Sequence, residues 1–204
     1  FQPAFVFPAD AGPTRVADVI SHETGHNFGL SHDGRTVDGY RSEYWTGNSL
    51  FVPIMGSGLS PLSQWSKGTY SGSTNTEDDL AVIRDHGGTY RTDDHGDTAA
   101  SATTIAGPEF SVDGIITSSS DVDVFSITVG AGTFQMTALP SPFGPNLDIA
   151  LELRNGAGAT VATSNPSTEL RNGIQAVGLG ASISASLSAG TYTVSLTATS
   201  ASGR

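Results

Sequence analysis

Three histidines near the start of the chain have the spacing of a metal site. They belong to the pattern H-E-x-x-H-x-x-G-x-x-H-D, whose fixed positions are His22, Glu23, His26, Gly29, His32 and Asp33. Histidines four residues apart on a helix lie on one face, with Cβ atoms about 5–6 Å apart, so both imidazoles can reach one ion. Gly29 permits a turn that returns His32 to the same ion. Three neutral nitrogen ligands leave a fourth position open, which is typical of a catalytic rather than a structural zinc.

Glu23 is the candidate general base of this site. Zinc lowers the pKa of a bound water toward about 7. A carboxylate beside the ion can take the proton from that water and later pass it to the leaving amine. The expected cofactor is therefore Zn²⁺ and the expected reaction is hydrolysis. The motif alone also accommodates a zinc hydrolase that acts on a non-peptide bond.

These residues resemble the metzincin zinc peptidases, and the aspartate after the third histidine is most similar to the reprolysin-type branch. The resemblance implies a zinc endopeptidase in which His22, His26 and His32 hold the metal and Glu23 is the catalytic residue. The expected partner is a protein or peptide substrate.

The same family has a methionine turn beneath the zinc. Its match here is Val52-Pro53-Ile54-Met55-Gly56, with Met55 placed 23 residues after His32. The resemblance thus implies that Gly29 and Met55 are structural residues of the site. It also implies that residues 57–65 form a wall of the substrate pocket, whereas Tyr70 follows Met55 at too long a distance to be an additional zinc-side hydroxyl.

The composition excludes several function classes. The 204 residues carry a formal net charge of −11, with 20 acidic and 9 basic residues. Nucleic-acid binding is not expected because phosphate contacts need lysine and arginine patches, and an anionic membrane surface is unfavourable for the same reason. No run of 18 apolar residues is present, so no membrane-spanning helix is expected. The absence of cysteine excludes disulfides and a cysteine nucleophile.

Two helices and one strand are expected in the first half of the chain. Residues 3–8 have the pattern of a short strand between prolines. Pro13 suits a first helical turn, and an apolar stripe then predicts a helix to Phe28 that ends at Gly29. A second helix is expected from Thr76 to about His86, with Asn75 as its N-cap.

Residues 34–52 have the mixed composition of an irregular loop. Tyr40, Tyr44 and Trp45 in this loop either line a substrate cleft or cover the small core below the site. Both interpretations remain open at this stage. The acidic residues 77–79 are best explained as charges that stabilise a first helical turn.

The second half of the chain changes to the period-two alternation of half-buried strands, separated by glycine-rich turns. Regularly spaced short strands without a helical pattern predict a β-sandwich. The expected strands begin or centre at Phe110–Ile115, Val122–Val129, Thr133–Ala138, Leu147–Leu153, Ala159–Ala162, Ile183–Leu187 and Thr191–Leu196.

Motifs in this half resemble a bacterial pre-peptidase C-terminal domain. They begin at His95-Gly-Asp97, continue through Asp121-Val-Asp123-Val-Phe125 and Asn146-Leu-Asp148-Ile, and end at Gly190-Thr-Tyr192. The resemblance implies a secreted, extracellular bacterial protein. Some relatives bind calcium and some bind extracellular polymers such as collagen, so Ca²⁺ is a second candidate cofactor. Its candidate ligands are Asp97, Asp121, Asp123 and Asp148.

The expected fold class is α+β, with a partial metzincin catalytic domain over residues 1–92 followed by an all-β sandwich over residues 93–204. A metzincin domain has a twisted sheet before its zinc helix, whereas only residues 3–8 are expected to be a strand here. We therefore expect a fragment of a longer secreted precursor that lacks the N-terminal part of the catalytic domain. The main hypothesis is a secreted zinc endopeptidase. The alternative is a substrate-binding or export module in which the sandwich is the working part.

Overall fold

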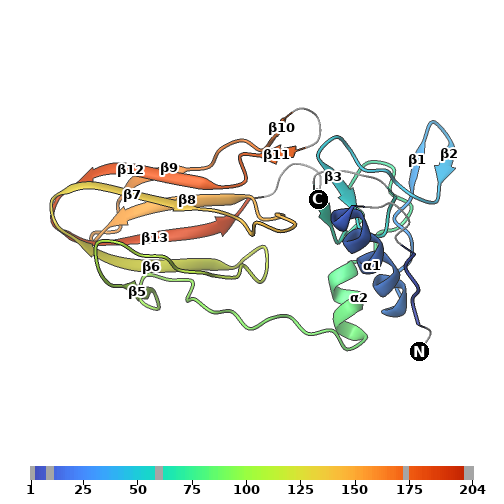
Figure 1. Ribbon diagram of the computed structural model, residues 1–204, viewed down its shortest axis with the longest axis horizontal. Coiled ribbons are helices and arrows are strands. Elements are labelled where there is room, and N and C mark those ends of the chain that lie inside the picture. The colour runs from blue at the N-terminus through green and yellow to red at the C-terminus, as the bar shows by residue number, and fades with distance from the viewer. Residues whose placement is uncertain (1–2, 8–11, 58–61, 172–174, 200–204) are drawn as a thin grey trace. The chain divides into compact units, whose positions relative to one another are not determined.

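The structure is a computed structural model that describes residues 3–7, 12–57, 62–171 and 175–199, and it is rich in β-strands (Figure 1). The chain divides into two compact units. The first takes in the residues up to Tyr90 together with Glu169–Ala176, and the second consists of Arg91–Thr168 and Val177–Thr199. The described residues contain two helices against thirteen strands, so the prediction of a β-rich chain is confirmed. No helix in these ranges is long and apolar enough to cross a membrane.

Helix α1 (Pro13–Asn27) is the element that carries the first two histidines of the motif, as predicted. Pro13 occupies the first helical position, where its missing N–H is not needed. The helix ends because Gly29 adopts a φ of 96°, which a side chain would disfavour. The Leu30 N–H then donates to the Gly25 carbonyl at 3.1 Å and closes the last turn. This ending reverses the chain so that His32 can return toward the helix.

The strand expected over residues 3–8 is not found. Residues 3–7 form no strand, and Pro8 lies outside the described residues. Phe5 and Phe7 are exposed, so no neighbouring element covers their apolar side chains. A strand without a partner lacks the ladder hydrogen bonds that stabilise it, which explains the difference.

The loop expected over residues 34–52 contains a β-hairpin. Strands β1 (Arg35–Val37) and β2 (Tyr40–Ser42) pair antiparallel around the two-residue turn Asp38-Gly39. Both turn residues have positive φ, 49° and 83°, the geometry that suits the twist of a tight hairpin. The Asp-Gly pair is a signal of such a turn that the sequence interpretation missed.

Three further elements complete the regular structure of residues up to Tyr90. Strands β3 (Phe51–Pro53) and β4 (Leu62–Gln64) pair in parallel. Helix α2 (Asp79–Asp85) begins three residues later than predicted, because the Asp78 side chain caps the Ala81 N–H. The predicted cap, Asn75, instead accepts from the Glu77 N–H at 3.0 Å in a local turn.

The second unit consists mainly of two sheets. The larger has the order β5-β6-β13-β8-β9, with β5 (Thr103–Ile105) parallel to β6 (Val122–Val129) and the other pairs antiparallel. The smaller pairs β12 with β7. The remaining bounds are β7 (Gly132–Ala138), β8 (Ile149–Asn155), β9 (Thr160–Ser164), β12 (Ala181–Leu187) and β13 (Gly190–Ala198). The short strands β10 (Glu169–Arg171) and β11 (Gln175–Val177) pair with each other, and their residues up to Ala176 belong to the first unit.

One hydrophobic core joins the two sheets of this unit. The larger sheet contributes Ile127, Leu151 and Val194, and the smaller contributes Phe134 and Ile183. Alternate residues of each strand point into this core, which is the period-two pattern seen in the sequence.

Six of the seven predicted strand positions of this unit are confirmed, and one is wrong. Residues 110–115 form no strand, and the edge of the larger sheet is instead β5, which was not predicted. The Asp113 carbonyl and the Ile115 N–H bond to the side chains of His95 and Asp94 instead of joining a ladder.

Candidate metal centre

The three histidines of the motif come together at the C-terminal half of α1. One ring nitrogen of each of His22, His26 and His32 lies within 4.8 Å of one from the others. The ring centroids of the three pairs are 4.7–5.3 Å apart. The group can therefore hold a metal ion, as the sequence predicted.

Each imidazole is oriented through its Nδ1 atom, which contacts an oxygen acceptor. Because carbonyl and carboxylate oxygens accept hydrogen bonds, each Nδ1 carries the proton and each Nε2 keeps its lone pair. Ligand histidines are commonly held in this way by a second hydrogen bond. The contacts are His22 Nδ1 to Ile54 O (2.7 Å), His26 Nδ1 to Leu30 O (2.9 Å) and His32 Nδ1 to Glu43 Oε1 (2.9 Å).

The Nε2 atoms of His26 and His32 lie 2.9 Å apart. With both Nδ1 atoms protonated, two lone pairs face each other at this distance and need a proton or a cation between them. A metal ion with Zn–N distances of about 2.0–2.1 Å fits between such ligands after small adjustments. A cation bound between these two atoms would relieve this contact.

The pKa of His22 is lowered from its ordinary value. Burial of the half-buried ring is the main cause, and the neighbouring His26 and His32 add to it, against the raising effect of the Ile54 hydrogen bond. The neutral form of His22 is thus favoured at neutral pH. Metal binding needs this form because only a neutral imidazole offers a lone pair.

Met55 lies directly against α1 and follows Ile54, whose carbonyl oxygen orients His22. It is fully buried, and a Cβ atom added at Gly25 would meet its Sδ at 2.5 Å. Its turn is closed by the Gly56 N–H, which donates to the Pro53 carbonyl at 2.9 Å. The Asp33 N–H donates to the Met55 carbonyl, also at 2.9 Å, and so ties this turn to the third histidine.

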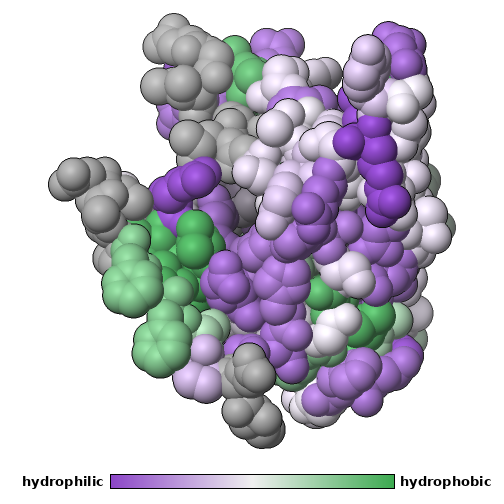
Figure 2. Space-filling model, turned by 90° about the vertical axis from the view of Figure 1, so that its right-hand side faces the viewer, coloured by the Kyte–Doolittle hydropathy of each residue, from purple (hydrophilic) through white to green (hydrophobic). Residues whose placement is uncertain are grey.

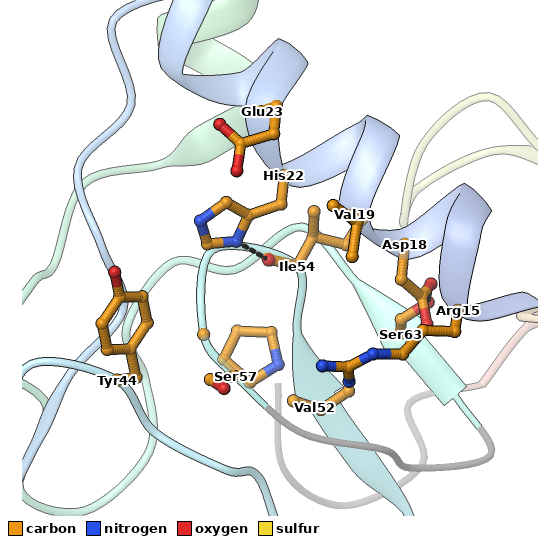
Figure 3. A pocket seen from close by; sticks show the side chains of 12 residues that line it. Arg15, Asp18, Val19, His22, Glu23, Tyr44, Val52, Ile54, Ser57 and Ser63 are labelled. Atoms are coloured by element: carbon orange, nitrogen blue, oxygen red, sulfur yellow. Dashed lines mark hydrogen bonds between the residues drawn. The ribbon is translucent and has the colours of Figure 1, made fainter. Parts of the chain in front are cut away.

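A cavity of about 290 Å³ opens beside His22 and Glu23 (Figure 3). Both side chains project toward it from α1, with Tyr44 on one side and Arg15 on the other. Among the residues that line it are Arg15, His22, Glu23, Tyr44, Ile54 and Ser57. Of the predicted pocket wall over residues 57–65, Ser57 and Ser63 line the cavity, while residues 58–61 lie outside the described residues.

The aromatic residues near the site have different roles. Tyr44 lies over His32 with a centroid distance of 4.1 Å and lines the cavity, whereas Tyr40 is exposed on β2. Trp45 is buried and stacks on Tyr70 at 3.8 Å. The Tyr70 hydroxyl donates to the Gly34 carbonyl, so it has a structural partner. Trp45 therefore belongs to the core and Tyr44 lines the cavity, while Tyr40 does neither.

Two buried carboxyl groups lie behind the site. Burial raises the pKa of Asp33 to about 6, with a further contribution from Glu77, against the lowering effect of a Tyr70 hydrogen bond. Burial raises the pKa of Asp79 to about 7, against the lowering effect of the Ser66 N–H bond, and Asp33 adds to the rise. Near neutral pH Asp79 is therefore partly protonated, which lessens its repulsion with Asp33.

Glu43 is a residue of this site that the sequence interpretation missed. It comes from the loop after β2 and holds His32 from outside the histidine cluster. No spacing rule relates the two residues, because the contact depends on how the β1–β2 hairpin folds back.

Replacing Glu43 with alanine should weaken zinc binding by roughly tenfold. Loss of a carboxylate behind a ligand histidine lowers metal affinity by about 10–100-fold. The low end is expected here because the Glu43 side chain is 73% exposed and water can replace it. Zinc affinity is measured by competition with a chromophoric chelator. Asp38→Asn, at the exposed hairpin turn, is the control for charge loss, and an affinity for Glu43→Ala equal to that of the control would contradict the role of Glu43.

The candidate calcium ligands are only partly brought together. Asp97 and Asp121 form one group with Asp93, and Asp123 forms another with Asp93 and Asp94. Asp148 belongs to neither group among the described residues, so the structure does not bring it together with the other candidates. Asp93 and Asp94 were not predicted, although both belong to the same acidic stretch as Asp97.

The fold and site thus define a β-rich chain with a three-histidine group that can hold a metal ion. No protein-family model, no curated protein and no solved structure matches the chain.

Proposed function

We propose that this chain is part of a secreted zinc-dependent endopeptidase of the metzincin type. The proposal rests on the sequence pattern around His22 and on the pair of facing Nε2 atoms of His26 and His32. The turn that contains Met55 is proposed to be the methionine turn of that family. Because the histidines are oriented by three separate oxygen acceptors, the ligand set is preorganised.

Zinc is the ion that suits this donor set. Three imidazoles with one open position are typical of catalytic zinc, whereas calcium and magnesium prefer oxygen ligands. When bound, zinc supplies Lewis acidity toward the substrate carbonyl and lowers the pKa of water. The first and second histidines are fixed by helix geometry, and the third is fixed by the Gly29 turn.

The residues of the chain have distinct tasks in the proposed reaction. Glu23 takes the proton of the attacking water and passes it to the leaving amine as the peptide bond breaks. The cavity beside Glu23 receives a substrate side chain. Tyr44 covers His32 and narrows the approach from that side.

Metal content and peptide cleavage test the proposal together. The purified chain should retain about one zinc per molecule, measured by elemental mass spectrometry. It should also cleave members of a peptide library, lose this activity with a chelator and regain it with added zinc. A panel of ester substrates, assayed in parallel, tests hydrolysis of non-peptide bonds. A chain that binds no zinc, or whose cleavage is insensitive to chelation, would overturn the proposal.

A further inference from the structure

The cavity beside Glu23 extends along α1 away from the histidines. Arg15 and Val19 precede His22 at helical spacing, so the three side chains lie on one face of α1, and all three line the cavity. The seven residues from Arg15 to His22 span about 10 Å along a helix axis. The cavity therefore leads from the proposed reaction centre to the first turn of α1.

A positive charge lies at the far end of this cavity. Among the described residues that line it, Arg15 is the one lysine or arginine. Figure 3 shows the Arg15 side chain stretched from α1 across the end of the cavity that lies opposite Tyr44. The guanidinium thus faces the space that a substrate side chain would enter.

The walls between Glu23 and Arg15 are largely aliphatic. Val19 comes from α1, Val52 from β3, and Ile54 follows β3 directly. Val52 is 3% exposed, so this wall is part of the packed interior. Aliphatic walls lower the local dielectric constant, which strengthens the attraction between two opposite charges at the end of the cavity.

The two carboxylates that line the cavity already have tasks. Asp18 Oδ1 accepts from the Ser63 hydroxyl at 2.6 Å, which ties α1 to β4. Glu23 lies at the other end, where it serves the proposed reaction. Asp18 reduces the positive potential at the far end of the cavity without occupying the space in front of Arg15, and this gives a second residue through which the potential can be changed.

The position of the cavity indicates which substrate residue enters it. In the proposed reaction Glu23 passes a proton to the leaving amine, so the amine nitrogen must lie next to Glu23. This nitrogen belongs to the residue that follows the scissile bond. The side chain of that residue is therefore the one that reaches the cavity.

We propose that the cavity selects glutamate or aspartate as the residue that follows the scissile bond, and that Arg15 is the residue that selects it. This inference rests on the proposed peptidase function and names its substrate class. A guanidinium can hold a carboxylate through two parallel N–H···O bonds. A lysine or arginine in the same position would face the charge of Arg15, and like charges held close together are unfavourable.

Cleavage of matched peptides tests this specificity. The peptides are identical except for glutamate, aspartate, glutamine or lysine after the scissile bond, and the ratio of kcat/KM values measures the preference. The parent should cleave an acidic peptide about three- to tenfold faster than the glutamine peptide, a modest factor because Arg15 is exposed to water. The lysine peptide should be the slowest.

Four variants make the result specific to Arg15. Arg15→Gln should abolish the preference for acidic peptides, and Arg15→Glu should reverse it in favour of the lysine peptide. Asp18→Asn should increase the preference, because it removes the opposing charge. Arg41→Gln is the matched control: Arg41 is exposed on β2 and does not line the cavity, so its loss should leave the preference unchanged.

Peptide binding provides a measurement that does not depend on turnover. In the zinc-loaded Glu23→Ala protein, fluorescence anisotropy should show tighter binding of the glutamate peptide than of the glutamine peptide. Adding Arg15→Gln in this background should remove the difference.

Two results would overturn the inference and leave the proposed peptidase function intact. One is equal cleavage of the glutamate, glutamine and lysine peptides by the parent. The other is a preference for acidic peptides that persists in Arg15→Gln. Failure to cleave any peptide, together with equal binding of the glutamate and glutamine peptides, would overturn the specificity and the proposed function together.

Discussion

Glu23→Ala should retain zinc and lose peptide hydrolysis by a factor of about 10²–10⁴, the usual contribution of a positioned general base. Glu23 lines the cavity beside His22 but is not one of the three residues that can hold the ion. Its removal should therefore leave the metal stoichiometry unchanged. Initial cleavage rates on the best library peptide and zinc content per chain are measured on the same preparation.

Two further variants make the Glu23 result specific. Glu23→Gln keeps the size of the side chain but cannot accept the proton, so it should be as inactive as Glu23→Ala. Asp38→Asn removes one negative charge from the exposed hairpin turn and should cleave at the parent rate. If Glu23→Ala cleaved at the parent rate, the assigned role of Glu23 would be wrong. If it lost zinc as well, Glu23 would be a structural part of the centre.

Gly25→Ala should destabilise the protein by about 1–3 kcal/mol, the usual effect of an extra methyl group in a tightly packed interior. At an open helical position the same change stabilises by about 1 kcal/mol. Gly25 is buried in α1, and the added Cβ atom would meet Met55 Sδ at 2.5 Å and Leu30 Cδ1 at 3.2 Å. Met55 is fully buried, so it has little room to move away.

Urea unfolding of the metal-free protein measures this effect without the contribution of bound zinc. Thr24→Ala is the matched control, because Thr24 is the exposed neighbour in the same helix and should lose no stability. Displacing Met55 should also disturb the turn that holds His22 through Ile54, so zinc affinity is expected to fall together with stability. A Gly25→Ala protein more stable than the parent would show that Met55 packs loosely against α1.

Substitutions on the surface of the first unit are expected to change the stability of the protein much less than Gly25→Ala. The face in Figure 2 is mainly hydrophilic, with hydrophobic side chains gathered in limited areas. Exposed Phe5 and Phe7 precede α1 and contribute little to a core. Substitutions on such a face usually change the free energy of unfolding by less than about 0.5 kcal/mol, so the expected destabilisation by Gly25→Ala stands well apart from them.

The sequence alone determined the features that depend on neighbouring residues. The spacing of His22 and His26 fixes both on one face of α1, and Gly29 ends that helix by its positive φ. The period-two alternation predicted six strands of the second unit correctly, because a strand exposes alternate residues to one core. These rules act over a few residues and do not need the rest of the fold.

The tertiary structure decided what depends on residues far apart in the chain. Glu43 behind His32, the Ile54 carbonyl behind His22 and Met55 against Gly25 are contacts between separate elements. The grouping of the aspartates likewise depended on the fold and not on the sequence pattern. Asp148 looked equivalent to Asp121 and Asp123 in sequence, yet the fold brings Asp93 and Asp94 to them instead. Composition and spacing cannot show which of these residues lie together, since the distance between two side chains is set by how the strands and loops between them pack.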